Sequence, residues 1–213
     1  MSRSTYLTVA GDGEAELEVK RSRFIGCVSR VGTEDEARAA VDRVRRRFWD
    51  ARHNCSAFVL GPDGAVARSS DDGEPSGTAG APMLEVLRGR ATSDVVAVVS
   101  RYFGGVLLGA GGLVRAYSDA VRAALDDAGT LERRLLHRYD VQVGHADAGR
   151  LQNDLRSRDV AVLGVDYGER VTLHVAVEAA LGGGFGALVS ELTAGTARAR
   201  ATGTGWADVS GPR

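Results

Sequence analysis

The strongest constraint on the fold comes from residues 94–128, where a strand pattern, a glycine-rich segment and a helix pattern follow one another. The run 95–99, Val-Val-Ala-Val-Val, is short, apolar and rich in β-branched residues, which predicts a buried strand. Five glycines then fall within residues 104–112, the glycine segment. From residue 113 the apolar spacing is that of one helix face, which ends at Gly129. The apolar stripe consists of Leu113, Tyr117, Val121 and Leu125.

This order of elements predicts an anion-binding site at the start of the helix. The first N–H groups of a helix have no partner within it, and the helix dipole places positive charge there. Arg101 and Arg115 add full charges on either side, and Tyr102 or Phe103 offers a stacking face for a base. The residues expected to contact the anion are Arg101, Tyr102, Gly104, Gly105, Gly109, Gly111, Gly112 and Arg115.

The glycine segment does not match a known nucleotide-binding fingerprint. Residues 109–114 lack the last glycine of GxGxxG, and Ala110 stands where a P-loop requires lysine. The alternative is that these glycines serve only close packing and positive φ in a tight connection. Both interpretations remain open at the level of sequence.

Composition limits the classes of protein that the chain can belong to. Its 213 residues suffice for one large domain or two small ones, and its 44% hydrophobic and 26% charged residues are ordinary for a globular protein. The net charge of −1 gives no overall attraction to nucleic acid, so such a role would rest on a local patch. No apolar run nears the length of about 20 residues that a membrane span needs, and the first 13 residues do not resemble a signal peptide. We therefore expect a cytoplasmic protein without a membrane partner.

Two cysteines, Cys27 and Cys55, are present without a CxxC pair, so neither a zinc site nor a disulfide is expected, and no other cofactor is predicted. At strand spacing His53 and Cys55 would share a face, where a cysteine nucleophile with a histidine partner is conceivable. Residues at i and i+2 of a strand do not normally make that short contact. We favour Cys55 as a small core residue and His53 as a hydrogen-bonding edge residue.

A long acidic loop, residues 69–82, separates a predicted hairpin from a short helix. Loops of this length in a compact domain are usually functional or disordered. Its carboxylates Asp71, Asp72 and Glu74 could ligate Mg²⁺ or act as acid and base, or form a solvated turn. The interpretation with the fewest assumptions is that the loop pairs with Arg101 or with a basic partner.

The first half of the chain reads as mixed strands and helices. The predicted elements are strands over 14–19, 24–31, 54–60 and 65–68, a helix that opens with the capping box Thr33 to Glu36, and a short helix that begins at Pro82.

After Gly129 the pattern restarts as strand, helix, strand, strand, helix, strand, which suits an α+β domain of ferredoxin-like type. The predicted strands span 135–143, 160–167, 170–178 and 197–204, and the helices span 146–157 and 183–193. We expect domains over residues 1–132 and 133–206, followed by a tail over 207–213, with fraying from Gly203 onward.

Several blocks of the chain closely resemble the signature motifs of the IMPACT (YigZ) family. They are residues 20–25 (KRSRFI), 51–55 (ARHNC), 70–82 (SDDGEPSGTAGAP) and 99–117 (VSRYFGGVLLGAGGLVRAY). Leu107 departs from the pattern, since many relatives carry lysine or another residue there, and this removes a possible charge from the glycine segment. The last third is similar to the less sharply patterned C-terminal domain of the bacterial two-domain members.

The resemblance implies an N-terminal domain with the fold of ribosomal protein S5 domain 2 and a C-terminal ferredoxin-like domain akin to one of elongation factor G. Both folds occur on the ribosome, and eukaryotic relatives restrain the amino-acid starvation kinase. The leading expectation is therefore a non-enzymatic, translation-associated regulatory protein that binds RNA, the ribosome or a translation-related protein. One alternative is a hydrolase of a small phosphorylated or peptide substrate that uses Asp72 and Glu74 with His53. The other is a protein-interaction adaptor that docks through the acidic loop.

Overall fold

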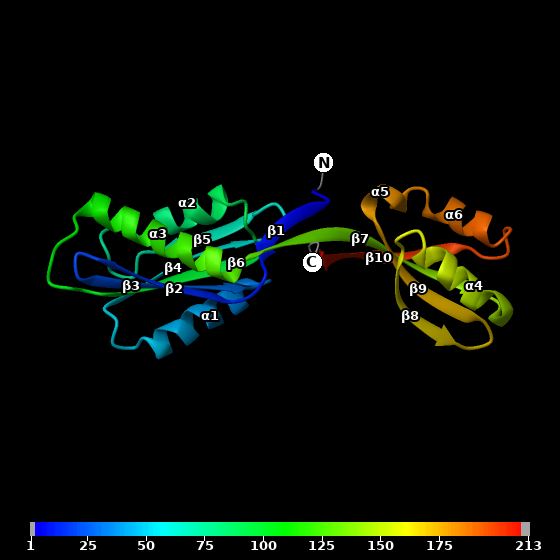
Figure 1. The fold of residues 1–213 in the computed structure, drawn as a ribbon, viewed down its shortest axis with the longest axis horizontal. Helices are drawn as coiled ribbons and strands as arrows, with labels where there is room; N and C mark the ends of the chain where they lie inside the picture. The colour runs from blue at the N-terminus through cyan, green and yellow to red at the C-terminus, as the bar shows by residue number, and fades with distance from the viewer. Residues whose placement is uncertain (1–2, 210–213) are drawn as a thin grey trace. The chain divides into compact units, whose positions relative to one another are not determined.

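A computed structural model describes residues 3–209, and these divide into two compact units, Arg3–Glu132 and Arg133–Asp208 (Figure 1). We call them the first and the second unit. Each combines helices with a mainly antiparallel sheet, so the predicted α+β class is confirmed. No helix among the described residues is both long enough and apolar enough to cross a membrane.

The first unit is built on one five-stranded sheet with the order β2-β3-β6-β4-β5. Every neighbouring pair in it is antiparallel. The strands are β2 (Gly13–Val19), β3 (Ser22–Arg30), β4 (His53–Leu60), β5 (Val66–Ser70) and β6 (Val95–Tyr102). The predicted strand over 95–99 is therefore the middle strand of the sheet, extended by three residues.

Helices cover both faces of this sheet. Helices α2 (Gly80–Gly89) and α3 (Ala110–Ala128) lie on one side, and α1 (Glu34–Arg47) lies on the other (Figure 1). Side chains of β6 alternate between the two cores: Val95, Ala97 and Val99 pack under α2 and α3, whereas Val96 and Val98 pack against α1. Burial on both faces explains why this strand reads as a continuous apolar run.

One helix start agrees with the prediction and two begin a few residues earlier. Thr33 caps α1 as predicted, accepting a hydrogen bond from the Glu36 N–H at 3.2 Å. Helix α3 begins at Ala110 rather than at Leu113, because the residues before Leu113 are an exposed alanine and two glycines, which add no large apolar side chain to the helical stripe. Helix α2 likewise begins at Gly80, two residues before Pro82.

One strand was not predicted. Strand β1 (Thr5–Val9) forms a parallel bridge between Leu7 and Thr92, and the hydroxyl of buried Tyr6 donates a hydrogen bond to Asp94.

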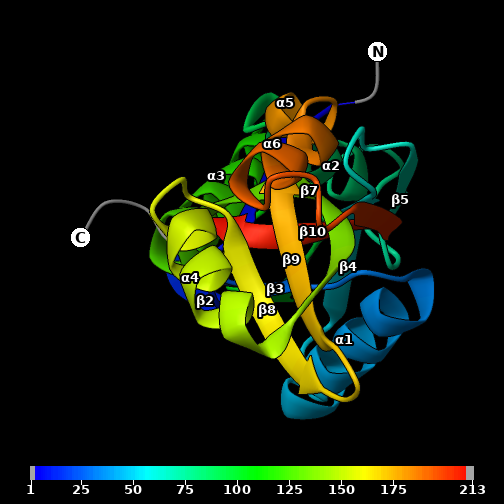
Figure 2. The same ribbon diagram turned by 90° about the vertical axis from the view of Figure 1, so that its right-hand side faces the viewer.

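The second unit has the predicted order of strands and helices, with one short helix added (Figure 2). Its central strand β7 pairs with β9 and with β10, and β8 lies beyond β9. The elements are β7 (Thr130–Val143), α4 (His145–Arg156), β8 (Ala161–Tyr167), β9 (Val171–Glu178), α5 (Ala179–Gly182), α6 (Phe185–Leu192) and β10 (Ala199–Val209). Apolar residues of α4, α6, β7 and β9 form its core.

The expectation of fraying from Gly203 onward is wrong for residues 203–209, because β10 continues to Val209. The glycines that suggested fraying have a packing reason at one position. A Cβ on Gly205 would lie 2.8 Å from Nη2 of Arg138 on β7, so glycine leaves room for that guanidinium. Residues 210–213 of the predicted tail lie outside the described residues.

Candidate anion-binding site at the start of helix α3

The glycine segment leads from the end of β6 into an open helix start. Gly105 and Gly109 have φ of 81° and 72°, values that glycine adopts without steric cost. Gly109 is the N-cap residue of α3, no side chain caps the helix, and its first turn contains no acidic residue. The N–H groups of the first turn are therefore available to an anion.

Exposed cations stand near both ends of the glycine segment. Arg115 follows the first turn of α3 and is exposed. At the other end the β2–β3 turn places exposed Lys20 and Arg21 next to Gly104, whose backbone N–H donates to Ser22 Oγ at 3.2 Å. None of the three cations makes a hydrogen bond or ion pair with another residue in the range 3–209.

Sequence reasoning did not include Lys20 and Arg21 in the site. The available signal was that residues 20–23 are too basic to belong to a core. Their proximity to Gly104 depends on the long-range pairing of β3 with β6, in which Arg23 stands opposite Tyr102. That pairing is not visible in the local sequence.

Two glycines of the segment have opposite steric surroundings, which gives a direct prediction. A Cβ on Gly104 would lie 2.0 Å from the carbonyl oxygen of Arg21, so we expect Gly104→Ala to lower the free energy of unfolding by about 1–3 kcal/mol. A Cβ on Gly111 would meet nothing within 4 Å, so Gly111→Ala should leave stability unchanged or raise it by up to about 1 kcal/mol. Urea unfolding of the two variants measures the contrast. Equal effects of both substitutions would contradict the close approach at Gly104.

Arg101 is not a free charge at this site, which corrects the sequence prediction. Its side chain is 8% exposed, and Nη1 lies 2.6 Å from Oε1 of Glu74 in the acidic loop. The guanidinium carbon also lies 5.4 Å and 5.7 Å from the ring centres of Phe24 and Phe103. The physical reason is strand parity: Arg101 shares a face of β6 with Val99, and that face is buried under α2 and α3. The predicted pairing of the acidic loop with Arg101 is confirmed.

Tyr102 is also engaged within the fold. Its hydroxyl donates to Asp50 at 2.7 Å, and the guanidinium carbon of Arg23 lies 5.4 Å from its ring centre. Phe103 is 44% exposed and is the more accessible of the two aromatic rings.

Glu74 belongs to a buried polar network. Its side chain is 3% exposed, and Oε1 accepts hydrogen bonds from Arg101 and, at 2.8 Å, from the hydroxyl of Tyr117. Cys55 Sγ lies 3.0 Å from the carbonyl oxygen of Asp71 and 3.4 Å from the Tyr117 hydroxyl oxygen, so its single S–H proton can be donated to either of them. Burial raises the pKa of the Cys55 thiol to about 12, so it stays protonated at neutral pH. The expectation that Cys55 is a core residue is confirmed.

The other acidic-loop carboxylates hold the loop in place. Asp71 accepts hydrogen bonds from the backbone N–H groups of Gly77, Ala79 and Gly80 at 2.8, 3.1 and 2.8 Å. Asp72 accepts from the Asn54 N–H at 2.7 Å and from Arg45 at 2.6 Å, while Nδ1 of His53 lies 2.9 Å from the Asp72 carbonyl oxygen.

These contacts give His53, Asp72 and Glu74 partners within the fold. Glu74 is buried in its ion pair, whereas the Asp72 side chain keeps 30% exposure beside Arg45. Within residues 3–209, no three His, Cys, Asp or Glu side chains gather as a metal site would require, so the Mg²⁺ interpretation of Asp71, Asp72 and Glu74 lacks support.

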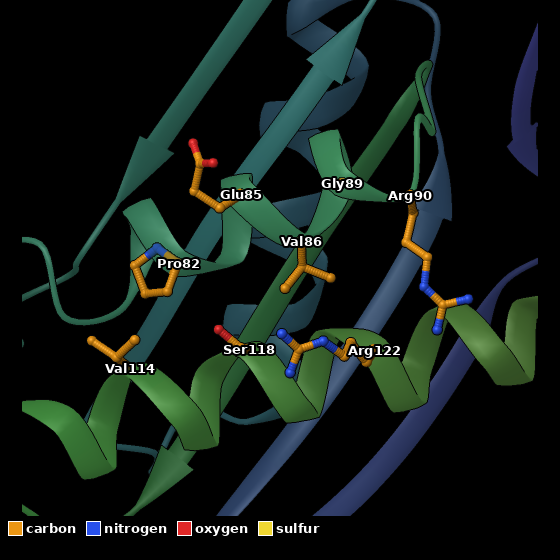
Figure 3. A pocket seen from close by; sticks show the side chains of 8 residues that line it. All are labelled: Pro82, Glu85, Val86, Gly89, Arg90, Val114, Ser118 and Arg122. Carbon is orange, nitrogen blue, oxygen red and sulfur yellow. The ribbon is translucent and has the colours of Figure 1, made fainter.

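A groove of about 450 Å³ runs between α2 and α3 (Figure 3). Pro82, Val86 and Val114 give it apolar walls. The arginines at its side are paired with carboxylates of α3: Arg90 lies 2.7 Å from Asp126, and Arg122 lies 2.6 Å from Asp119.

Apolar side chains are exposed along the glycine segment and the start of α3. Phe103, Val106, Leu107 and Val114 are 44%, 40%, 82% and 38% exposed. Of these four residues, Val114 also lines the α2–α3 groove (Figure 3). Sequence reasoning missed this surface, although the run Val106-Leu107-Leu108 between glycines was the available signal.

Comparison with known proteins shows relatives along most of the chain. The family model of the Impact N-terminal domain matches residues 20–125, and that of a domain of unknown function (DUF1949) matches residues 141–196. IMPACT family member YvyE of Bacillus subtilis is 42% identical over 191 residues, 90% of this chain and 88% of that protein. IMPACT family member YigZ of Escherichia coli is 40% identical over 181 residues, 84% of this chain and 89% of that protein.

A solved crystal structure of a hypothetical protein has a similar fold. It is 37% identical in sequence, covers 93% of this chain and 97% of its own, and superposes with a TM-score of 0.65. The glycine segment, the acidic loop and the basic β2–β3 turn all lie within the region matched by the Impact N-terminal domain. YvyE and YigZ are 42% and 40% identical to this chain over most of their own length. Together with the two family models, they establish that the chain belongs to the IMPACT family.

Proposed function

We propose that this protein is a translation-associated regulatory protein that binds a phosphate-bearing partner, RNA or the ribosome, at the start of α3. The observation that carries the proposal is the uncapped, acid-free first turn of α3 with the exposed cations Lys20, Arg21 and Arg115 near the glycine segment. Open N–H groups and unpaired cations together form the kind of site that phosphate oxygens occupy.

The local arrangement matters because the chain as a whole does not attract nucleic acid. Its net charge is −1, so long-range steering of RNA toward the protein is weak. Lys20, Arg21 and Arg115 form no ion pair with any residue that the structure describes, whereas Arg101 is paired with Glu74. Exposed Phe103 adds a ring on which a base can stack.

The family resemblance of the sequence motifs supports the ribosome as the source of the phosphate groups. The two folds that this resemblance implies occur in ribosomal protein S5 and in elongation factor G. The phosphate chemistry itself rests on the geometry at α3 and not on the family.

Co-sedimentation with 70S ribosomes and separated subunits tests the proposal. We expect binding at about 50 mM salt that weakens steeply by about 200 mM, with a slope of about 0.7 log units per phosphate contact on single-stranded RNA. Arg115→Ala should weaken binding and lower the salt slope by about one contact. The combined Lys20→Asn, Arg21→Asn variant should do the same, and asparagine suits the positive φ of 48° and 67° at these positions.

The matched control is Arg46→Ala, which removes an exposed, unpaired arginine from α1 on the opposite face of the sheet. It should bind as the unchanged protein does. Ribosome binding that does not change with salt concentration would refute a phosphate site at α3. An equal loss of binding in Arg46→Ala and Arg115→Ala would refute it as well.

A second candidate function is suggested by Leu107, whose side chain is 82% exposed at the edge of the same site. Exposed contiguous apolar residues commonly mark a protein-binding surface. In that case the partner would be a translation-related protein, and the glycine segment instead of the acidic loop would dock it. Leu107→Ser should then weaken co-sedimentation without changing the salt slope, whereas a phosphate site predicts that Arg115→Ala has the larger effect.

A further inference from the structure

We propose that the second unit contains an additional pocket for a phosphate group. The pocket has a volume of about 400 Å³ and is formed by β7, β10, the β8–β9 turn and the α6–β10 loop. Three lining residues are arginines, Arg170, Arg198 and Arg200, and one is a carboxylate, Asp140. All of the lining residues belong to the second unit, so this pocket is distinct from the site at α3.

Strand alternation brings these side chains to one face of the sheet. Arg200 lies on β10, and Arg198 is the residue just before that strand. Asp140 and Gln142 are alternate residues of β7. Residues at i and i+2 of a strand point to the same side. Val141 points to the other side, into the core beneath α4 and α6. The pocket therefore opens on the sheet face that the helices leave uncovered.

The arginines keep donors that the fold does not use. Arg198 is exposed and makes no hydrogen bond or ion pair with any residue that the structure describes. Arg170 donates Nη2 to the Gln142 carbonyl oxygen at 3.2 Å, and Arg200 donates Nη2 to Asp140 at 2.8 Å. A guanidinium has five N–H donors, so Arg170 and Arg200 also retain free ones.

The charge of the pocket stays positive after Asp140 is counted. Three guanidinium groups face one carboxylate, and that carboxylate is shared with the imidazole of His174, whose Nδ1 lies 2.7 Å from Asp140 Oδ1. The second ring nitrogen of His174 lies 2.9 Å from Asp166. Asp140 is thus already partnered on both oxygens, by His174 and by Arg200, which reduces its repulsion of an incoming anion.

Phosphate is the ligand chemistry that fits this set of donors. Planar guanidinium groups bind phosphate oxygens through paired N–H···O contacts, and several arginines in one pocket favour an anion with more than one charge. The volume exceeds that of a single phosphate and is in the usual range for small-ligand pockets. A pyrophosphate-like group fits the pocket, either from a free nucleotide or as neighbouring phosphates of an RNA strand.

The test is a titration of the ¹⁵N-labelled full chain with pyrophosphate and, separately, with a short single-stranded RNA, followed by amide NMR. We expect saturable shifts at the amides of residues 195–200 with at least one of the two probes. Arg198→Ala should weaken this binding by about tenfold or more, since charged hydrogen bonds are lost. The control Arg156→Ala removes an exposed, unpaired arginine of α4 that does not line the pocket and should bind as the unchanged protein does.

The probe that binds more tightly identifies the source of the phosphate. The proposal would be overturned if the amide resonances of residues 195–200 did not shift with either probe. It would also be overturned if Arg198→Ala and the unchanged chain bound the probe with equal affinity. Because the readout is local to the second unit, failure here leaves the site at α3 untouched, and failure at α3 leaves this pocket untouched.

Discussion

Replacing Glu74 by alanine is expected to lower the free energy of unfolding of the first unit by about 3–5 kcal/mol. The reason is the burial of its ion pair: the side chains of Arg101 and Glu74 are 8% and 3% exposed. Removing the carboxylate leaves the Arg101 guanidinium buried without its counter-charge, and Nε of Arg101 already has no hydrogen-bond partner. The Tyr117 hydroxyl loses its acceptor in the same substitution.

Urea unfolding of the full chain, followed through amide resonances of β6 and α3, separates this transition from that of the second unit. The double variant Glu74→Leu, Arg101→Met should recover most of the loss, because well-packed apolar residues can replace a buried ion pair. The matched control is Glu34→Ala, which removes a partly exposed partner of Arg38 on α1 and should cost less than about 1 kcal/mol. A Glu74→Ala variant with unchanged stability would contradict a structural role and would revive Glu74 as a catalytic candidate.

Asp71→Ala should lower the free energy of unfolding by about 1.5–3 kcal/mol, the usual range for hydrogen bonds to a charged group. This carboxylate accepts three backbone N–H groups, from Gly77, Ala79 and Gly80, and the last of them opens α2. Without Asp71 the N–H groups of buried Ala79 and Gly80 lose their acceptor. Asp42→Asn, a change at an exposed aspartate of α1 without a partner, serves as the control in the same urea titration.

The Asp71 contribution should also depend on pH in a defined direction. Burial raises the pKa of its carboxyl, but the hydrogen bonds from Gly77, Gly80 and Ala79 together outweigh burial and hold the pKa below its ordinary value. A carboxyl whose folded pKa is depressed stabilises the fold above its unfolded pKa of about 3.9 and loses that contribution as the pH falls through the folded pKa. The stability difference between the unchanged chain and Asp71→Asn should therefore be full at pH 6 and should shrink on acidification below pH 4. A difference that grows on acidification would contradict the assignment.

Most of the fold of the first unit could be predicted from sequence, because the apolar residues of its core strands and helices recur at the spacing typical of each element. The apolar run at 95–99 and the stripe from Leu113 correctly identified β6 and α3. The start of α3 was missed by three residues, because its first turn is exposed and contains two glycines. In the second unit the end of β10 was missed, because pairing with β7 overrides the low strand propensity of Gly203 and Gly205.

Only part of the candidate anion-binding site could be predicted from the sequence. The open helix start at Gly109 follows from local sequence, since glycine spacing and the change of period are local signals. Arg101 closely precedes the glycine segment in sequence, but strand parity puts its side chain on the same buried face as Val95, Ala97 and Val99, away from the predicted position. Lys20 and Arg21 required the pairing of β3 with β6, a contact between residues almost 80 positions apart.

The sequence suggested that the acidic loop pairs with Arg101, but it could not show which carboxylate makes that pair or what the other two carboxylates do. Three carboxylates in four positions look the same whether they face a metal, a partner or their own backbone. Asp71 bonds to N–H groups six to nine residues ahead, and Glu74 bonds to an arginine 27 residues away. These partners are set by how the loop folds over the end of the sheet.

The most direct test of a phosphate site at α3 is amide hydrogen exchange of Ala110, Gly111 and Gly112, measured in the free protein and in its complex with ribosomal RNA. These N–H groups stand in the first turn and have no acceptor within the helix, so they should exchange rapidly in the free protein. Phosphate oxygens bound at the helix start should slow their exchange, and Arg115→Ala should restore rapid exchange at the same RNA concentration. Exchange that stays as fast in a saturated complex as in the free protein would contradict the account and would move the binding surface away from α3.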